Sequence, residues 1–151
     1  MKKFLFIFLG ILLSACLTQP TPEPTSTPSL PFVIEAAGNP HASKPEDANL
    51  QISGVELTSM DLSENIGITP VRVVLRILGS LPRTCNALRI DVPAPNAEYN
   101  ILVKVYSLLD PNVTCEYVFK QFQASVLLGV YSTGRYTVWV NGSYVGDFVA
   151  D

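Results

Sequence analysis

The feature that most restricts how this 151-residue chain can fold is an alternation of apolar and other residues with a period of two. Successive side chains of a strand point to opposite faces, so this alternation predicts strands with one buried face. No long stretch repeats with the helical period. The alternation, with two flanking segments of strand-like composition, predicts about seven strands, over residues 51–57, 71–78, 88–92, 101–106, 122–128, 136–140 and 144–149.

Residues that break regular structure separate these segments, and one pair of them predicts a specific turn. Asn141 and Gly142 both tolerate the positive φ that a two-residue type I′ hairpin turn requires. We therefore expect residues 136–140 and 144–149 to form an antiparallel hairpin. About seven short strands in about 105 residues favour an all-β fold, an immunoglobulin-like antiparallel β-sandwich.

The segment Gly134-Arg135-Tyr136 opens the penultimate predicted strand. It resembles the tyrosine corner of immunoglobulin-type domains, where a tyrosine hydroxyl bonds to an upstream backbone group. The resemblance implies this role for Tyr136. Val138 stands where antibody domains have their second cysteine, and the only tryptophan, Trp139, lies late in the chain. The match is therefore with the broad sandwich class and not with antibody domains.

The last third of the chain combines Cys115, Phe122, the hairpin around Asn141-Gly142, and Phe148. This combination is similar to that of uncharacterised bacterial secreted and lipoprotein domains. Those domains share a cysteine, an apolar strand, a Tyr-Thr-Val-x-Val-Asn-Gly hairpin and a closing phenylalanine. The similarity implies a shared fold and location, and it brings no activity with it.

The N-terminal residues are typical of an export signal. Two lysines precede a ten-residue apolar run, which is too short to cross a bilayer because a spanning helix needs about 20 residues. The run ends in Leu13-Ser14-Ala15-Cys16, which resembles the lipobox of bacterial lipoproteins. The resemblance implies that residues 1–15 are removed and that acyl chains on Cys16 anchor the protein in a membrane. The alternative is an ordinary signal peptide with a chance cysteine.

Such an anchor implies an extracytoplasmic location, on the cell membrane or the outer membrane, and the sequence leaves open which. Residues 16–47 contain seven of the twelve prolines, which lack a backbone donor and disfavour helix and sheet. We interpret this stretch as a disordered linker that follows the lipidated cysteine, and residues 48–151 as the domain. Phe32, Val33 and Ile34 form an apolar patch in the linker. We expect it to dock on the domain, with a partner-binding motif as the alternative.

The chain has three cysteines, an odd number for an exported protein. If Cys16 carries lipid, Cys85 and Cys115 remain as a pair, and the compartment outside the cytoplasm permits a disulfide between them. Two buried free thiols are the alternative. A metal site is disfavoured because structural zinc takes four ligands, and the single histidine, His41, lies in the linker. No metal or cofactor is therefore expected.

No catalytic set is recognisable, and the chain is predicted not to be an enzyme. With His41 in the linker, a Ser–His–Asp or Cys–His site has no base within the predicted domain. Asp110, Asn112 and Glu116 share one loop, which we interpret as a turn, with a calcium site as the alternative. The net charge is -3 and no basic cluster follows the signal segment, which excludes a nucleic-acid partner.

Strand parity places Trp139 on the face opposite Tyr136 and Val138, so it is predicted to point outward. Because exposed aromatic residues form hot spots for proteins and sugars, Trp139 and Tyr144 are the candidate binding residues. The alternative is that Trp139 packs on Tyr144 or covers the sheet edge. We expect a surface-displayed binding or adhesion module with a protein or glycan ligand. The alternatives are a structural or accessory lipoprotein of the cell envelope and a sandwich that inhibits proteases. The oligomeric state stays open.

Overall fold

The structure is a computed structural model that describes residues 33–34, 38–65 and 70–151. It confirms the all-β prediction, with ten strands and one short 3-10 helix among these residues. The predicted signal peptide, Cys16 and Phe32 lie outside the described residues. No helix within the described ranges is long and apolar enough to cross a membrane.

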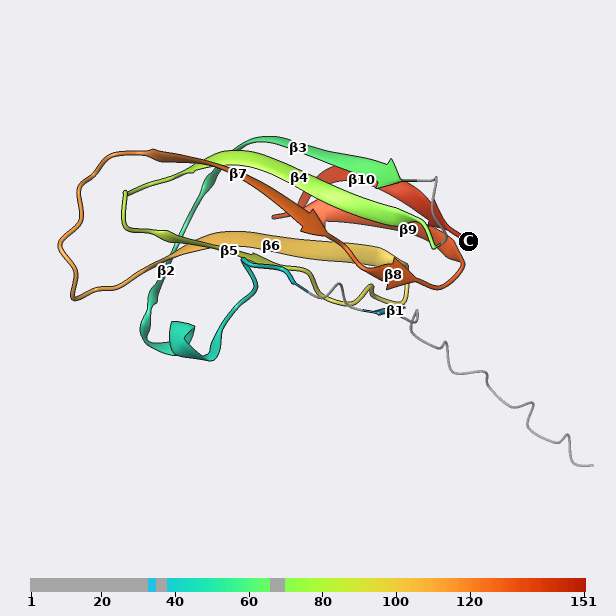
Figure 1. Ribbon diagram of the computed structural model, residues 1–151, viewed down its shortest axis with the longest axis horizontal. Helices are drawn as coiled ribbons and strands as arrows, with labels where there is room; N and C mark the ends of the chain where they lie inside the picture. The colour runs from blue at the N-terminus through green and yellow to red at the C-terminus, as the bar shows by residue number, and fades with distance from the viewer. Residues whose placement is uncertain (1–32, 35–37, 66–69) are drawn as a thin grey trace, which may run out of the picture.

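Two sheets pack face to face as a sandwich (Figure 1). The first sheet is antiparallel and has the order β3-β4-β7. Its strands are β3 (Glu56–Asn65), β4 (Arg72–Leu81) and β7 (Lys120–Leu127). The inward face of this sheet supplies one layer of the core, for which β4 alone buries Val73, Leu75, Ile77 and Leu81.

The second sheet has five strands in the order β10-β9-β6-β2, with β5 paired to the other edge of β6. They are β10 (Ser143–Ala150), β9 (Gly134–Val140), β6 (Asn100–Leu109), β2 (Gln51–Ser53) and β5 (Ala87–Asp91). Seven of the ten strands have five residues or more, and six of these coincide with or extend a segment predicted from the sequence. The exception is β3, because the strand predicted over residues 51–57 ends at Ser53 as β2, and β3 begins at Glu56 and continues to Asn65.

One pairing departs from the antiparallel prediction, because β6 and β9 run parallel. The β5–β6 hairpin places β6, and not β5, beside β9, and β6 then runs in the same direction as β9. In immunoglobulin domains the third strand joins the sixth and seventh. Here the fourth of the long strands takes that position, so the two-layer architecture is kept while the strand order of this sheet differs.

The hairpin of β9 and β10 forms at the predicted turn. Asn141 and Gly142 have φ of 48° and 84°, and Val140 pairs with Ser143 across them. The Asn141 side chain also bonds to β6: its Oδ1 accepts from Val105 N at 2.9 Å, and its Nδ2 donates to Val105 O at 2.8 Å. Along this edge of β6, the Asn141 side chain therefore takes the place of a strand between the part that pairs with β9 and the part that pairs with β2.

The tyrosine corner is confirmed. The hydroxyl of Tyr136 donates to the Ser132 carbonyl at 2.9 Å, and its ring is fully buried. Tyr131 and Phe148 pack against this ring, and the Tyr131 hydroxyl donates to the Leu128 carbonyl. Burial raises the pKa of Tyr131. These aromatic residues close one end of the sandwich.

Part of the stretch assigned to the linker lies on the domain. Ile90 of β5 donates its amide to His41 O and accepts from Asn39 Nδ2, both at 2.8 Å, so this segment covers the outer edge of β5. Strand β1 (Val33–Ile34) pairs with β8 (Val130–Tyr131), which confirms docking of the apolar patch for these two residues.

An ion pair fixes the 3-10 helix η1 (Pro45–Asn49) to β5. Arg89 donates from Nε and Nη2 to the two carboxylate oxygens of Asp47, each at 2.6 Å. Both side chains are nearly buried, at 10% and 11% exposed. The hydrogen bonds from Arg89 lower the pKa of Asp47 to about 2.

The depressed pKa predicts loss of stability in acid. The pKa of an Asp in the unfolded chain is about 3.9, so the ion pair stabilises the fold fully above that pH. Its contribution is lost as the pH falls toward the folded-state pKa of about 2. Asp47→Asn should unfold more readily than the wild type at neutral pH, measured by urea midpoints, and the difference should shrink in acid. A difference that is equal at all pH values, or is matched by Asp151→Asn at the exposed C-terminus, would contradict this.

Candidate functional site

The predicted binding residues lie side by side on the outer face of the hairpin. Trp139 and Tyr144 are directly opposite in the β9–β10 register, and their rings meet edge to face at 5.6 Å between centroids. Trp139 is half-buried and Tyr144 is 55% exposed, while Tyr136 and Val138 point into the core as parity predicted. Leu102, opposite Trp139 on β6, is also exposed. We call these three exposed-face residues (Leu102, Trp139 and Tyr144) the hairpin patch.

Polar contacts hold the tyrosine of this patch in place. The Tyr144 hydroxyl donates to Asp147 at 3.0 Å, which raises the pKa of Tyr144, and Asp147 is ion-paired with Arg135. Trp139 therefore packs on Tyr144, as in the alternative interpretation, while the patch as a whole stays open to solvent.

A double-mutant cycle measures how much of the hairpin patch is packing. An edge-to-face aromatic pair contributes about 0.5–1.5 kcal/mol beyond its buried area. Trp139→Ala and Tyr144→Ala should therefore each lower the free energy of unfolding, and the double variant should lose less than the sum by about that coupling. Additive losses would mean that the two rings do not support each other. Val138→Ala, a core truncation, should cost about 1–3 kcal/mol.

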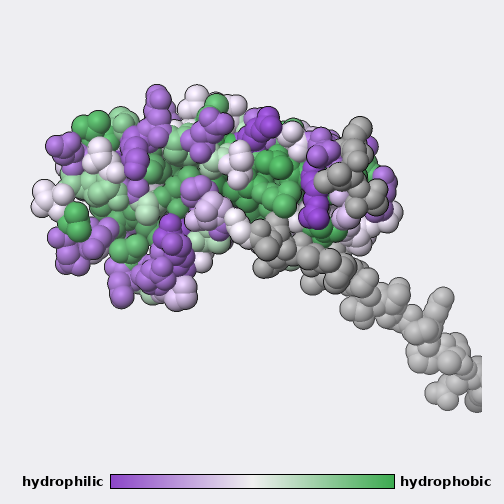
Figure 2. All heavy atoms as spheres, in the orientation of Figure 1, coloured by the Kyte–Doolittle hydropathy of each residue, from purple (hydrophilic) through white to green (hydrophobic). Residues whose placement is uncertain are grey.

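A second surface lies at the end of the sandwich formed by the connection from β6 to β7. Tyr117, Val118 and Phe119 are consecutive, and they are 80%, 54% and 66% exposed. We call these three residues the tip. The connection that carries them loops out at the left of Figure 1, and green side chains reach the surface among purple ones at that end in Figure 2. The sequence analysis did not single out these three residues.

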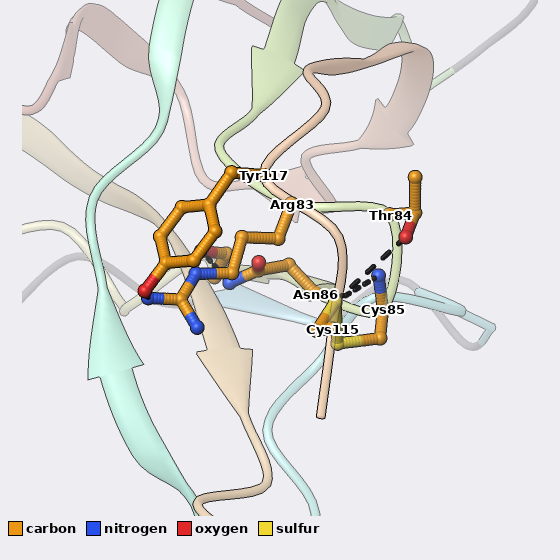
Figure 3. Close-up of a disulfide and its surroundings, with 7 residues drawn as sticks. Arg83, Thr84, Cys85, Asn86, Cys115 and Tyr117 are labelled. Carbon is orange, nitrogen blue, oxygen red and sulfur yellow. Dashed lines mark hydrogen bonds between the residues drawn. A yellow bond between two sulfur atoms is a disulfide. The ribbon is translucent and has the colours of Figure 1, made fainter. Parts of the chain in front are cut away.

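A disulfide and a cation–π contact hold the tip. Cys85 and Cys115 are bonded, as predicted, across a sequence separation of 30. The bond ties the connection from β4 to β5 to the residue two places before Tyr117 (Figure 3). The Arg83 guanidinium lies 3.9 Å from the Tyr117 ring centroid and donates to its hydroxyl at 2.6 Å. The most exposed aromatic ring of the described chain is therefore fixed in position.

A shallow hollow of about 260 Å³ adjoins Phe119. Its other walls include Gly54, Val55 and Pro82. The buried Ser107 hydroxyl donates to Gly54 O at 3.0 Å and so holds one wall. Sites for drug-sized ligands are typically about 300–1,000 Å³ and enclosed. The hollow is thus suited to one side chain of a larger partner.

The loop considered for calcium is a capped turn. Asp110 Oδ1 accepts from the backbone amide of Asn112 at 2.9 Å and from its side-chain amide at 3.1 Å. Both bonds are accepted by the same carboxylate oxygen of Asp110, as in a capped turn. In the described ranges, no three His, Cys, Asp or Glu side chains come together closely enough to hold a metal ion.

Comparison with known proteins places the domain. No curated protein and no solved structure matches the chain. A family model described as "ORF11 beta-sandwich domain" matches residues 75–150, which is 76 of the 151 residues. The matched part runs from β4 to the end of β10 and contains the disulfide, the tip and the hairpin patch. The chain therefore belongs to the ORF11 beta-sandwich domain family.

Proposed function

We propose that the protein is a lipid-anchored, surface-displayed binding or adhesion module without catalytic activity. The observation that carries the proposal is the tip, with three consecutive exposed apolar side chains on a fixed support. Its partner is a protein or a glycan outside the cytoplasm. The anchor is the acylated Cys16 implied by the lipobox resemblance.

The energetics of the tip support a contact surface. Burying an apolar side chain of this size is worth about 1.5–3 kcal/mol, so three exposed ones represent stabilisation that the isolated domain does not use. Contiguous apolar surface on a soluble domain often marks an interaction site, and aromatic residues are enriched in such sites. The disulfide and Arg83 order the tip in advance, which lowers the entropy cost of binding.

The position of the tip fits display away from a membrane. Strand β1, through which the N-terminal part of the chain joins the domain, pairs with β8 at the end opposite the tip (Figure 1). A proline-rich linker that precedes β1 extends by about 3.1 Å per residue in polyproline II. A membrane anchor at Cys16 therefore leaves the tip as the leading surface of the domain.

The two cysteine side chains are engaged in a structural bond, which supports a binding role. Cys85 and Cys115 are consumed by the disulfide. His41 sits against β5, where its backbone oxygen accepts from Ile90, and burial lowers its pKa. The hollow beside Phe119 is too small and shallow to enclose a substrate.

The test uses the full chain and has an anchor arm and a tip arm. Cys16→Ser should abolish incorporation of labelled fatty acid and release the protein from membranes. Tyr117→Ser/Phe119→Ser, which removes the tip, should abolish retention on a glycan array or capture of an envelope or host protein. Trp139→Ser/Tyr144→Ser, which removes the hairpin patch, is the matched control and should leave that binding unchanged.

Each arm has a clear contrary result. Labelling that persists in Cys16→Ser would end the lipoprotein proposal. Binding that survives loss of the tip but is abolished with the hairpin patch would move the contact surface to Trp139 and Tyr144. A chain that binds nothing through either surface would contradict the module proposal.

A further inference from the structure

The tip lies within a five-residue segment that is complementary to its own reverse, with opposite charges at its two ends and aromatic residues at matching positions. The order is Glu116, Tyr117, Val118, Phe119, Lys120. An acid and a base stand at the ends, an aromatic residue follows inward from each end, and a valine lies at the centre. Antiparallel strands that pair about a twofold axis at Val118 bring Glu116 opposite Lys120 and Tyr117 opposite Phe119.

The segment is free to pair. Its five residues are all exposed. Within the described part of the chain, neither Glu116 nor Lys120 makes an ion pair, and no backbone hydrogen bond joins residues 116–119 to another segment. The segment leads directly into β7, whose first residue is Lys120.

The free edge of β7 adjoins this segment. β7 pairs with β4 over eight residues without a bulge, and no strand among the described residues pairs with its other edge. The remaining long edges are covered: the segment at Asn39 and His41 bonds to β5, and β3 lies beside β10 where Gly146 meets Leu62. Open edges bind other strands unless charges, prolines or bulges prevent it, and β7 has one charge, at its end.

We infer that the partner of the tip is a second copy of this chain, joined by antiparallel pairing of residues 116–120 about a twofold axis at Val118. The inference rests on the proposed function, in which the tip is the contact surface. Opposite-charge and aromatic pairs across antiparallel strands are stabilising, and the twofold axis creates two of each. A second copy supplies both charges and both rings in the required order.

The small area of this contact determines the conditions under which the two copies pair. Five residues from each copy bury far less than the roughly 1,200–2,000 Å² of a stable complex. The pair is therefore weak in dilute solution and depends on the high local concentration of chains held at a membrane. Tip-to-tip pairing also leaves the β1 ends of both copies away from the contact.

Cysteine cross-linking in membranes that carry the full chain tests the register. With the axis at Val118, the two Val118→Cys thiols lie opposite each other, at a Cα spacing of about 4.5–5.5 Å that a disulfide spans. Mild oxidation should give a covalent dimer on a non-reducing gel. Gln123→Cys, exposed on β7 but beyond the paired segment, is the matched control and should give little dimer.

Charge reversal tests the pairing itself, in the Val118→Cys chain. Glu116→Lys or Lys120→Glu alone sets like charges opposite each other at both ends and should lower the dimer fraction about threefold or more. The double reversal restores opposite charges and should restore the dimer. The same variants without the introduced cysteine, labelled and held in phosphatidylcholine vesicles, should show the same order in energy transfer between chains.

Dimer formation that is equal for Val118→Cys and Gln123→Cys, or that the double reversal fails to restore, overturns the inference. If no dimer forms but the tip variant still loses binding to a glycan or a foreign protein, the proposed function stands and the second copy is wrong. If the tip variant changes neither dimer nor binding, both fail.

Discussion

The sandwich depends on the hydrogen bonds of one strand, β6. It pairs with β5 along one edge, and with β9 and then β2 along the other. The interval between β9 and β2 is filled by the side chain of Asn141, which bonds to both backbone groups of Val105. Asn141 therefore supplies the positive φ of the hairpin turn and also a substitute for a missing piece of strand.

The tip is held in position because the connection that carries it is bonded to the strands around β6. β6 ends at Leu109, and the connection that follows carries Cys115, whose disulfide partner precedes β5 on the other edge of β6. Closing a connection in this way restricts the unfolded chain and limits how the tip can move. Arg83 then fixes the Tyr117 ring from the adjoining connection. Exposed apolar side chains on a fixed support favour a contact surface over a flexible loop.

The parts of the structure set by local pattern could be predicted from the sequence, and those set by distant partners could not. Alternation located the long strands, and Gly-x-Tyr located the corner in which Tyr136 bonds to Ser132. The parallel pairing of β6 and β9 was not predicted, because an alternation with a period of two contains no information on the order of the strands in a sheet. The Asp47–Arg89 ion pair was not predicted because its two residues are 42 positions apart and Asp47 lies in a proline-rich stretch that was assigned to the linker. The tip was not predicted because three consecutive apolar residues show no periodic pattern. Whether their side chains are exposed depends on how the rest of the chain packs.

Hydrogen exchange of the backbone amides of residues 116–119 tests the central claim, that the tip is a pairing surface, most directly. The full chain is compared at low and high density in vesicles. The account predicts that the amides of alternate residues in this segment exchange freely at low density and become protected as density rises. The amides of β9 and β10 should be protected equally at both densities. Amides of residues 116–119 that stay unprotected at every density, or are protected already at the lowest, would contradict it.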